Sequence, residues 1–370
     1  MNHFILKQVS SIETELEQIG FDSAYLLKAE DKFRYKNIKI FNLTVGQANI
    51  LKQTALIFGA DCAVNKNVIT GNIEFSDVIL CGSYSQLKKI AEKLKFQPFR
   101  LAILAKDILD FLEFKPRKTK LVGILNITPD SFSDGGMYFS QKDAEKHFIS
   151  LLEDGADLID IGAESTRPNF EPVSAKEQIQ RLTPILKFAQ KENLSQKISI
   201  DTRNSEVADF VLNQGVEMIN DVSGLDFDNK IADIIAGYNA KVIIQHSTEK
   251  TDDYKNYKNV VEEVFLSLKN KIEFANEKGI KNIIIDPGIG FGKKREDNYR
   301  ILDKIEEFYS LNYPLMVGVS RKSLLGIKEN DNELKDTLSV ALSYPLVKKG
   351  VDYLRVHNVK IHKKMLNLFD

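Results

Sequence analysis

The sequence predicts an α/β protein, a (β/α)8 TIM barrel preceded by a small N-terminal α/β domain. A chain of 370 residues exceeds one average domain. From residue 118 onward, short apolar runs alternate with helical patterns, and a glycine recurs at the junctions between them. The first 117 residues do not share this alternation. We therefore assign residues 1–117 to an accessory domain and residues 118–370 to the barrel.

Composition narrows the functional class. Hydrophobic residues make up 43% of the chain and charged residues 28%, as in globular proteins with an ample core. The formal net charge is -1, so no overall field attracts nucleic acid or anionic lipid. The two cysteines provide neither a disulfide framework nor a metal-type spacing. No run approaches the roughly 20 apolar residues of a membrane helix. We expect a cytoplasmic protein with no nucleic-acid partner and no membrane contact.

The N-terminal domain combines helical and strand-like patterns. The helical patterns cover residues 45–58 and 85–94, and the strand-like runs cover residues 36–41 and 78–81. Pro116 and clustered basic residues predict that residues 114–119 form the linker to the barrel. None of these segments carries a chemical motif, so an accessory or interface role is the hypothesis for this domain.

The barrel region repeats one junction four times. A helical pattern ends in two polar residues and a glycine, and an apolar strand follows, at Gly155, Gly215, Gly279 and Gly350. Glycine after the last helical turn is the left-handed C-cap, which a residue without Cβ adopts most easily. Eight strands are predicted, at residues 121–125, 158–161, 198–200, 218–220, 242–244, 283–286, 315–317 and 353–356. Eight strands alternating with helices over about 250 residues match a (β/α)8 barrel better than a doubly wound open sheet, which usually has fewer strands.

Two of the intervening helices have clear N-terminal caps. Ser140 precedes a helical pattern with Ala144 and Phe148 on one face. Asn204 precedes another, with Val207 on its apolar face. Short polar side chains at these positions accept hydrogen bonds from the free amides of the first turn, so both helices should begin there.

Polar residues follow the predicted barrel strands. In such barrels the catalytic groups lie where the strands end and the βα loops begin. These positions are Asn126, residues 164–167, Asp201, Asn220, Gln245, His246, Asp286, residues 320–322, Arg355 and His357. A single aspartate at a strand end is often only a helix cap. Convergence of the whole set at one end of the barrel predicts a functional site.

Asp201, Asn220 and Asp286 predict recognition of a flat heterocycle. Their acceptors and the amide can pair with an amino group and a ring N–H on the ligand. A buried carboxylate that accepts two such donors orients the ligand and rejects analogues that lack them.

A cluster of opposite character accompanies these three residues. Arg167, Lys322, Arg355 and His357 suit a polyanion such as diphosphate. Asn126 can offer an oxygen to Mg²⁺, which prefers oxygen ligands and commonly bridges to substrate phosphates. The implied ligand therefore carries a heterocycle at one end and a diphosphate at the other, and the implied cofactor is Mg²⁺.

Two further segments and three histidines remain. Residues 288–293, Gly-Ile-Gly-Phe-Gly-Lys, fit neither phosphate-loop pattern and predict a tight turn. Residues 320–323, Ser-Arg-Lys-Ser, follow a strand and open a helical pattern, so amides at a helix N-terminus could hold an anion there. His147 lies within a helical pattern, and His3 and His362 lie near the termini, so we interpret these three as structural or solvated.

Several segments, in order, resemble the motifs of one family. Residues 125–136, Leu-Asn-Ile-Thr-Pro-Asp-Ser-Phe-Ser-Asp-Gly-Gly, and residues 161–168, Ile-Gly-Ala-Glu-Ser-Thr-Arg-Pro, resemble the two signatures of dihydropteroate synthase. The later motifs of that family resemble residues 201–202, 219–221, 286–293, 320–323 and 355–357. The resemblance covers about residues 118–370 and leaves out the N-terminal domain.

The resemblance implies a transferase of folate biosynthesis. The family joins p-aminobenzoate to 6-hydroxymethyl-7,8-dihydropterin diphosphate, which releases diphosphate and forms 7,8-dihydropteroate. The implied partners are these two small molecules and, by family precedent, a second copy in a homodimer. The family mechanism, with early departure of diphosphate, suits a site with charge stabilisers but no evident strong base or nucleophile.

The resemblance also implies roles for the residues at the strand ends. Asp201, Asn220, Asp286 and Lys322 would hold the pterin, with Arg355 over its face. Asn126 would bind Mg²⁺, and Arg355 and His357 would bind the diphosphate, so Asn126, Lys322, Arg355 and His357 form the expected catalytic set. Thr166, Arg167, Pro168, Phe291 and Ser323 would form the p-aminobenzoate and sulfonamide pocket. Loops near residues 127–138 and 163–174 would close over the site.

Four positions depart from the family pattern, and two alternative functions stay open. Gln245 stands where Met is common, Ala163 and Asn169 replace glycines, and Asn358 replaces Asp; none of these removes a proposed catalytic group. A pterin-binding methyltransferase barrel would not need the Ser-Thr-Arg-Pro loop, the Ser-Arg-Lys-Ser turn or the Arg-Val-His cluster. A catalytically silent, synthase-like protein should have lost a substrate-binding residue, and the chain retains all of them.

Overall fold

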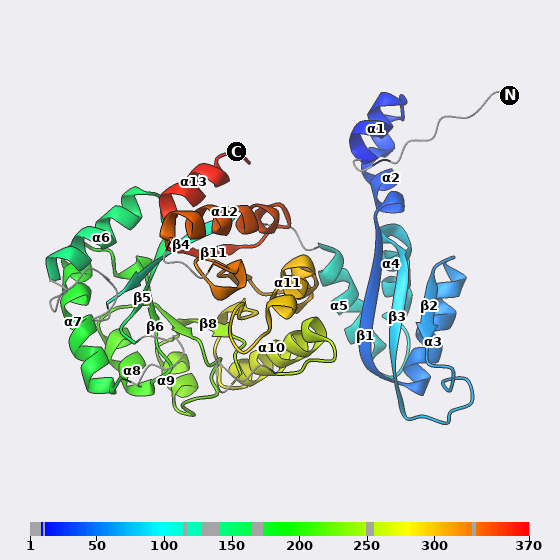
Figure 1. Ribbon diagram of the computed structural model, residues 1–370. Helices are drawn as coiled ribbons and strands as arrows, with labels where there is room; N and C mark the ends of the chain where they lie inside the picture. Colours follow the sequence, from blue (N-terminus) through cyan, green and yellow to red (C-terminus); the bar gives the residue numbers. More distant parts are fainter. Residues whose placement is uncertain are drawn as a thin grey trace. The chain divides into compact units, whose positions relative to one another are not determined.

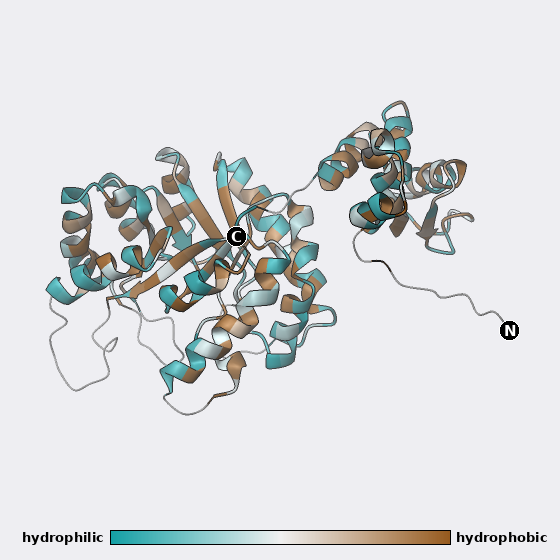
Figure 2. Cartoon of the chain, turned by 90° about the horizontal axis from the view of Figure 1, so that it is seen from above, coloured by the Kyte–Doolittle hydropathy of each residue, from teal (hydrophilic) through white to brown (hydrophobic). Residues whose placement is uncertain are grey.

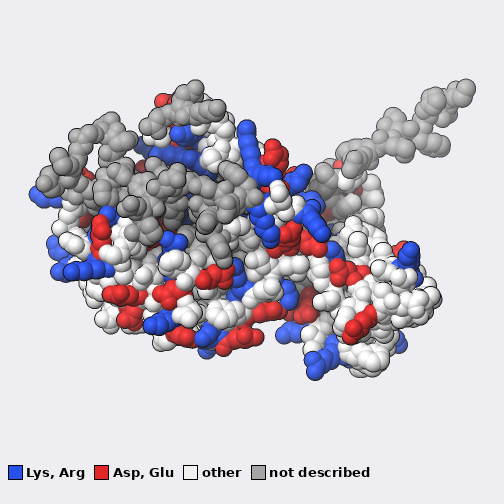
Figure 3. All heavy atoms as spheres, turned by 60° about the horizontal axis from the view of Figure 1, so that its bottom comes forward, with Lys and Arg blue, Asp and Glu red and all other residues white. Residues whose placement is uncertain are grey.

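The chain divides into two compact units, residues 1–114 and residues 115–370. The computed structural model describes residues 9, 12–113, 117–127, 141–164, 173–248, 255–327 and 331–369. Across these residues no helix has the length and apolar character to cross a membrane. Basic and acidic side chains alternate over the face in Figure 3, which agrees with the near-zero net charge.

The N-terminal unit is a three-stranded antiparallel sheet with helices (Figure 1). Its strands are β1 (Tyr35–Thr44), β2 (Asp61–Val64) and β3 (Phe75–Ser83), in the order β1-β3-β2. Its helices are α1 (Ile12–Gln18), η1 (Ser23–Tyr25), α2 (Leu26–Phe33), α3 (Val45–Ile57), α4 (Tyr84–Leu94) and α5 (Leu101–Glu113). The two strands and two helices predicted for this region are confirmed, whereas β2 and α5 were not predicted. The four residues of β2 are too short a run to show alternation.

Two capping boxes fix where α3 and α4 begin. Thr44 and Ser83 each end a strand and accept a hydrogen bond from the backbone amide three residues later, at Gln47 and Gln86. The glutamine side chains return a bond to the cap residue's own amide, which satisfies two free donors at once. Both helices therefore start directly at a strand end, and they bury residues such as Leu51 and Leu87 in the core of this unit.

The second unit is the predicted barrel, built on eight parallel strands (Figure 1). The strands are β4 (Lys120–Asn126), β5 (Leu158–Gly162), β6 (Ile198–Asp201), β7 (Met218–Asp221), β8 (Lys241–Gln245), β9 (Asn282–Asp286), β10 (Met316–Val317) and β11 (Tyr353–Val356). Their order is β10-β11-β4-β5-β6-β7-β8-β9, and a parallel bridge between Ile285 and Leu315 links the two edge strands. All eight predicted strands and the TIM-barrel class are confirmed.

Helices surround these strands and connect them. They are α6 (Gln141–Glu153), α7 (Ala175–Lys191), η2 (Ser195–Lys197), α8 (Ser205–Asn213), α9 (Ile231–Gly237), α10 (Val260–Glu277), α11 (Arg295–Asp303), η3 (Ile305–Leu311), η4 (Ser323–Leu325), α12 (Asn332–Lys348) and α13 (Val359–Leu366). The four predicted C-cap glycines all have positive φ, between 85° and 101°. Asn204 caps α8 as predicted, because its side chain accepts from the amides of Glu206 and Val207. Ser140 lies outside the described residues.

The barrel interior is filled by apolar side chains. Adding a Cβ to Gly123 of β4 would bring it against Leu151 of α6, so this position faces the outer helices. Its neighbour Val122 therefore faces inward, where it forms a buried cluster with Met218, Ile243, Ile284 and Met316. Figure 2 shows these strands as predominantly hydrophobic. This packed interior closes the barrel below the strand ends and leaves their carboxyl ends to carry polar groups.

Candidate functional site

The strand register places the predicted polar residues at one level of the barrel. Asn126 of β4 pairs with Gly162 of β5, which pairs with Asp201 of β6, which pairs with Asn220 of β7. On the other side of the sheet, Asp286 of β9 pairs with the last residue of β8. Four short, unrelated segments therefore deliver acceptors and an amide to the same end, as the parallel order requires.

Arg355 of β11 joins this level through two carboxylates. Its Nε donates to Oδ2 of Asp160 at 2.6 Å, and its Nη2 donates to Oδ2 of Asp201 at 3.1 Å. The same Asp160 oxygen accepts from Nδ2 of Asn220 at 2.9 Å, and the other oxygen accepts from Oγ of Ser199 at 2.5 Å. Asp160 is fully buried, and these three hydrogen-bond donors compensate for its lost hydration. The result is a polar network across four strands.

Asp160 joins this network although it was not among the polar residues predicted at the strand ends. It lies two residues before the end of β5, between Ile159 and Ile161, whereas only the last positions and the loops were considered. A signal for it exists in the sequence, because a carboxylate within a five-residue buried strand needs a partner. Its partners lie 39 to 195 residues away in the chain, so they cannot be identified from the sequence.

The charged groups of the site have shifted pKa values. The pKa of the Asp201 carboxyl is raised to about 7, first by burial and then by the charge of nearby Asp160, while Arg355 opposes the shift. Burial also raises the pKa of Asp286, against the influence of Lys322. The pKa of Lys322 falls to about 8 because burial disfavours its charge more than Asp286 favours it. Opposite charges thus lie close together in a poorly hydrated region.

Asn220 carries an acceptor that the described protein does not satisfy. Its Nδ2 is bonded to Asp160, but its Oδ1 is buried and has no hydrogen-bond partner among the described residues. A buried acceptor without a donor is unfavourable by about 1–3 kcal/mol. A ligand that offers an N–H here would remove that penalty, which agrees with the predicted role in holding a heterocycle.

Lys322 lies across the glycine-rich turn after β9. Its Nζ donates to the carbonyl of Ile289 at 2.6 Å and lies 4.6 Å from the centre of the Phe291 ring. A Cβ on Gly290 would approach Cδ of Lys322 to 3.1 Å, so a side chain there would crowd the lysine. The turn therefore holds Lys322 next to Phe291, and the roles predicted for these two residues stay predictions.

The turn itself is held by a second lysine, Lys293. Its Nζ donates to the carbonyls of His246, Gly288 and Phe291 at 3.2, 2.8 and 3.1 Å. A Cβ on Gly288 would lie 1.8 Å from the His246 carbonyl oxygen, so only glycine fits there. The segment is a tight turn, as predicted. Burial lowers the pKa of Lys293 to about 7, and its three carbonyl partners give it a structural role.

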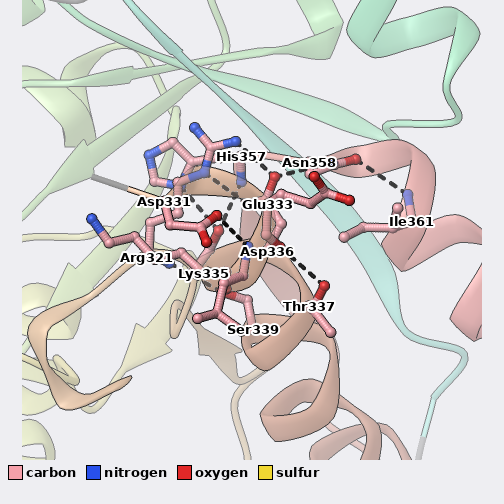
Figure 4. Close-up of polar contacts among 12 residues, drawn as sticks. Arg321, Asp331, Glu333, Lys335, Asp336, Thr337, Ser339, His357, Asn358 and Ile361 are labelled. Carbon is pink, nitrogen blue, oxygen red and sulfur yellow. Dashed lines mark hydrogen bonds and ion pairs between the residues drawn. The ribbon is translucent and has the colours of Figure 1, made fainter. Parts of the chain in front are cut away.

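The turn at residues 320–323 is anchored on α12 (Figure 4). Arg321 has a left-handed φ of 54°, and its guanidinium makes two bonds to Asp336, at 2.6 and 2.7 Å. Asn358 also donates to Asp336, at 3.0 Å. An amide rather than a carboxylate at position 358 therefore suits this structure, because it supplies a donor to Asp336. The predicted helix after this turn is only the three-residue η4, on which Ser323 is exposed.

His357 is a neutral member of the site. Its pKa is lowered to about 3, first by burial and then by the positive charges of Arg321 and Arg355. Its Nδ1 lies 3.0 Å from Oγ of Ser320. A ring with this pKa can offer a ligand a hydrogen bond but not the positive charge expected from the sequence.

The remaining predicted residues lie in the two predicted loops and at position 245. Thr166, Arg167, Pro168 and Asn169 lie outside the described residues, as do residues 128–138 of the first loop. Gln245 is buried and donates to the Val222 carbonyl at 3.4 Å.

Asn126 is the candidate metal ligand. Across the described residues no group of three or more His, Cys, Asp or Glu could hold a metal ion. Mg²⁺ does not require such a group, since it is often bound by one or two protein oxygens together with substrate phosphates and water. A Cβ on Gly162 would lie 3.3 Å from Oδ1 of Asn126, so the glycine leaves room beside that oxygen. A single amide oxygen at the rim of the site fits this mode of binding.

The barrel is similar in sequence to proteins of known function. Residues 122–357 match the family described as pterin binding enzyme, which spans nearly the whole barrel. The chain belongs to the pterin-binding enzyme family. A dihydropteroate synthase of Clostridium beijerinckii is 39% identical over 258 residues, which cover 68% of this chain and 94% of that protein.

Two further comparisons differ in what they cover. A crystal structure of dihydropteroate synthase from Clostridium difficile in the presence of pteroic acid has a TM-score of 0.64 and 37% identity, and it covers 70% of this chain and 98% of that chain. A bifunctional dihydropteroate synthase/dihydropteroate reductase of Helicobacter pylori is 31% identical over 371 residues, 97% of this chain and 96% of that protein. Only the second of these pterin-binding enzymes also covers the N-terminal unit.

Proposed function

We propose that the barrel is a dihydropteroate synthase. In this reaction the bond between the pterin methylene carbon and the diphosphate oxygen breaks, and diphosphate leaves with the electron pair. A bond forms between that carbon and the nitrogen of p-aminobenzoate, which then loses a proton. The observation that carries the proposal is the meeting of Asp201, Asn220 and Asp286 with Lys322 and Arg355 at one end of a pterin-binding barrel.

The acceptors on β6, β7 and β9 would hold the pterin. Oδ1 of Asn220 has no donor among the described residues, its register neighbour Asp201 has a side chain only 11% exposed, and Asp286 at the same end of the barrel is buried. Donors on the flat ring of a pterin match acceptors of this kind, and analogues without those donors would leave the acceptors unpaired. Arg355, held in its plane by two carboxylates, would lie over the ring.

The cations would stabilise the departing diphosphate. Lys322 and Arg355 carry the charge, and neutral His357 can contribute a hydrogen bond. Fixed positive groups in a poorly hydrated site stabilise charge that develops as the carbon–oxygen bond lengthens. An aromatic amine is nucleophilic when neutral, so the site needs no strong general base.

Mg²⁺ would complete the anion site through Asn126. The amide oxygen would provide one protein ligand, and bound Mg²⁺ would supply charge neutralisation to the diphosphate. Replacing Asn126 by Ala should raise the Mg²⁺ concentration needed for half-maximal activity, which a metal titration would measure.

Phe291 and Ser323 would contribute to the p-aminobenzoate pocket, together with Thr166, Arg167 and Pro168.

We also infer that the protein is a homodimer. Exposed apolar side chains near the C-terminus support this inference. The rings of Tyr344 and Phe369 are exposed and their centres lie 5.0 Å apart, and Leu368 is 75% exposed. Sedimentation analysis would measure the oligomeric state.

Diphosphate release with and without p-aminobenzoate tests the synthase proposal. The wild-type chain should release diphosphate from the dihydropterin diphosphate only when the amine is present. Lys322→Ala and Asp201→Ala should each lower kcat/KM by about 100-fold or more, because each removes a charged contact from a largely buried site. Lys304→Ala, an exposed lysine on the barrel exterior, is the matched control and should leave the rate unchanged.

The results of this assay test the proposed function and the assignment of the site residues separately. Absence of amine-dependent turnover with pure wild-type protein would exclude the synthase and favour the silent alternative. Full activity in Lys322→Ala or Asp201→Ala would retain the function but overturn the site assignment.

A second activity, dihydropteroate reduction, is the further candidate. The full-length match to a bifunctional synthase/reductase includes the N-terminal unit, whereas the single-function relative above covers 68% of the chain. The reaction would add two electrons and two protons to 7,8-dihydropteroate and give 5,6,7,8-tetrahydropteroate. A hydride donor of the reduced nicotinamide or reduced flavin class must supply the electrons.

Product analysis tests this second activity. The full chain and a fragment of residues 118–370 would be incubated with 7,8-dihydropteroate and each donor in turn. The full chain should form the tetrahydro product and oxidise an equal amount of donor, and the fragment should not. No product from the full chain with either class of donor would remove the reductase proposal and leave the synthase proposal intact.

A further inference from the structure

Asp160 has contacts beyond those of a simple buried ion pair. One of its oxygens, Oδ2, accepts from two groups of the ligand site, Nδ2 of Asn220 at 2.9 Å and Nε of Arg355 at 2.6 Å. Its other oxygen accepts from Ser199, which lies on β6 directly beside it in register. Asp160 has no solvent-exposed surface, so these hydrogen bonds are what compensates the carboxylate for its lost hydration.

The bond to Asn220 determines what that residue can recognise. A side-chain amide has one donor end and one acceptor end, and either can face a ligand. Because Asp160 accepts and cannot donate when ionised, it fixes the Nδ2 end of Asn220 on itself. The acceptor end, Oδ1, is then turned away and has no partner among the described residues. Without Asp160 the amide could rotate and present the wrong end.

The bond to Arg355 restricts the guanidinium in the same way. Nε is held by Asp160 and Nη2 by Asp201, so two fixed points define the plane of the group. A planar cation held at two points can lie parallel to a flat ring without losing side-chain freedom when the ligand binds.

We propose that Asp160 is a positioning and specificity-determining residue for the pterin, which it does not contact: it fixes the acceptor end of Asn220 toward the ligand and the plane of Arg355 over it. This inference rests on the proposed synthase function. The alternative is that Asp160 and Arg355 form an ion pair that only stabilises the barrel. The positioning role and the purely structural role predict different effects on ligand affinity.

Three variants separate these roles. Asp160→Val removes both acceptors and places a β-branched residue of similar size, which suits a strand, at this position. Asp160→Asn removes the charge, can keep one acceptor oxygen for Asn220 and Arg355, and presents an NH2 group to Oγ of Ser199, which can accept from it. Ser199→Ala removes the bond to Oδ1 and leaves the two positioning bonds in place. Binding of 6-hydroxymethylpterin would be measured by fluorescence, and KM for p-aminobenzoate by steady-state kinetics, on the full chain.

The proposal predicts a graded loss confined to the pterin. Asp160→Val should weaken 6-hydroxymethylpterin binding by about 100-fold, Asp160→Asn by about threefold to tenfold, and Ser199→Ala by less than about twofold. KM for p-aminobenzoate should change by less than about threefold in all three. Pterin affinity in Asp160→Val within about threefold of wild type, with only a lowered Tm, would overturn the proposal.

A second test, a crystal structure with bound ligand, uses the wild-type protein and so does not depend on the folding of a variant. In a crystal structure of the wild-type chain with 6-hydroxymethylpterin, the Asn220 amide should contact an N–H donor of the ligand and Arg355 should keep both carboxylates. Contact between the Asn220 amide and an acceptor of the pterin would overturn the proposal. Failure of wild-type protein to form 7,8-dihydropteroate, with pterin binding intact, would instead remove the synthase function and leave the orientation result to stand.

Discussion

Asp201 shows how a ligand-binding carboxylate affects the stability of the empty fold. Its pKa is raised to about 7 in the folded chain, first by burial and then by Asp160, while Arg355 lowers it and Asp221 and Glu164 add repulsion. An aspartate in an unfolded chain has a pKa of about 3.9. Between about pH 4 and pH 7 the folded state therefore binds more protons than the unfolded state, and the free energy of unfolding falls as pH rises through this window.

Asp201→Asn should remove this dependence. The variant cannot ionise, so its Tm relative to wild type should rise by several degrees between pH 4.5 and pH 7.5, equivalent to about 1–3 kcal/mol. The loss of a partner for Arg355 adds an offset that does not vary with pH. Thermal unfolding of both proteins without ligand would measure the difference, and a constant difference across this range would contradict the shifted pKa.

The residue scale also shows the limit of prediction from sequence. Asp201 and Asp286 could be found because each ends an apolar run, and the position after such a run is where a barrel carries its chemistry. Asp160 could not be assigned a role, because its importance depends on donors from three other strands. The charge state of His357 was equally inaccessible, since it follows from burial and from Arg321, a residue 36 positions earlier in the chain.

At the scale of elements, α12 determines the shape of the turn that carries Lys322. Arg321 adopts a left-handed φ that few residues other than glycine take easily, and Asp336 of α12 holds it with two hydrogen bonds. The backbone amide of Arg321 also donates to Oγ of Ser339 on the same helix, at 3.1 Å. The sequence predicted the turn from its position after a strand, but it could not show that a helix beginning at Asn332 would hold it.

Asp336→Ala should loosen this turn. The free energy of unfolding should fall by about 1–3 kcal/mol, less than for a fully buried pair because the Arg321 side chain is 30% exposed. Diphosphate affinity should also fall, by about tenfold, because Lys322 follows Arg321 directly. Glu333→Ala, an exposed acidic residue on the same helix, is the control. Urea unfolding and calorimetric titration with diphosphate would measure both effects, and equal results for the two variants would contradict the role of Asp336.

At the scale of the whole molecule, the two units differ in how well their sequences predicted them. The barrel repeats one βα junction, and every repeat supports the others, so all eight strands could be placed. The N-terminal unit has no repeat, and short β2 shows no periodicity of its own. Its core is nevertheless separate and contains fully buried residues such as Leu51, Leu80 and Ile90.

Two separate cores predict that the barrel folds and works alone. A fragment of residues 118–370 contains all barrel strands and the whole of residues 122–357, which match the pterin-binding enzyme family. Its synthase kcat/KM should be within about threefold of the full chain, and its thermal transition should remain cooperative. A fragment starting at residue 124 is the control, because it removes half of β4, which pairs with both β5 and β11. That shorter fragment should fail to fold; loss of synthase activity in the fragment 118–370 as well would mean that the N-terminal unit takes part in forming the site.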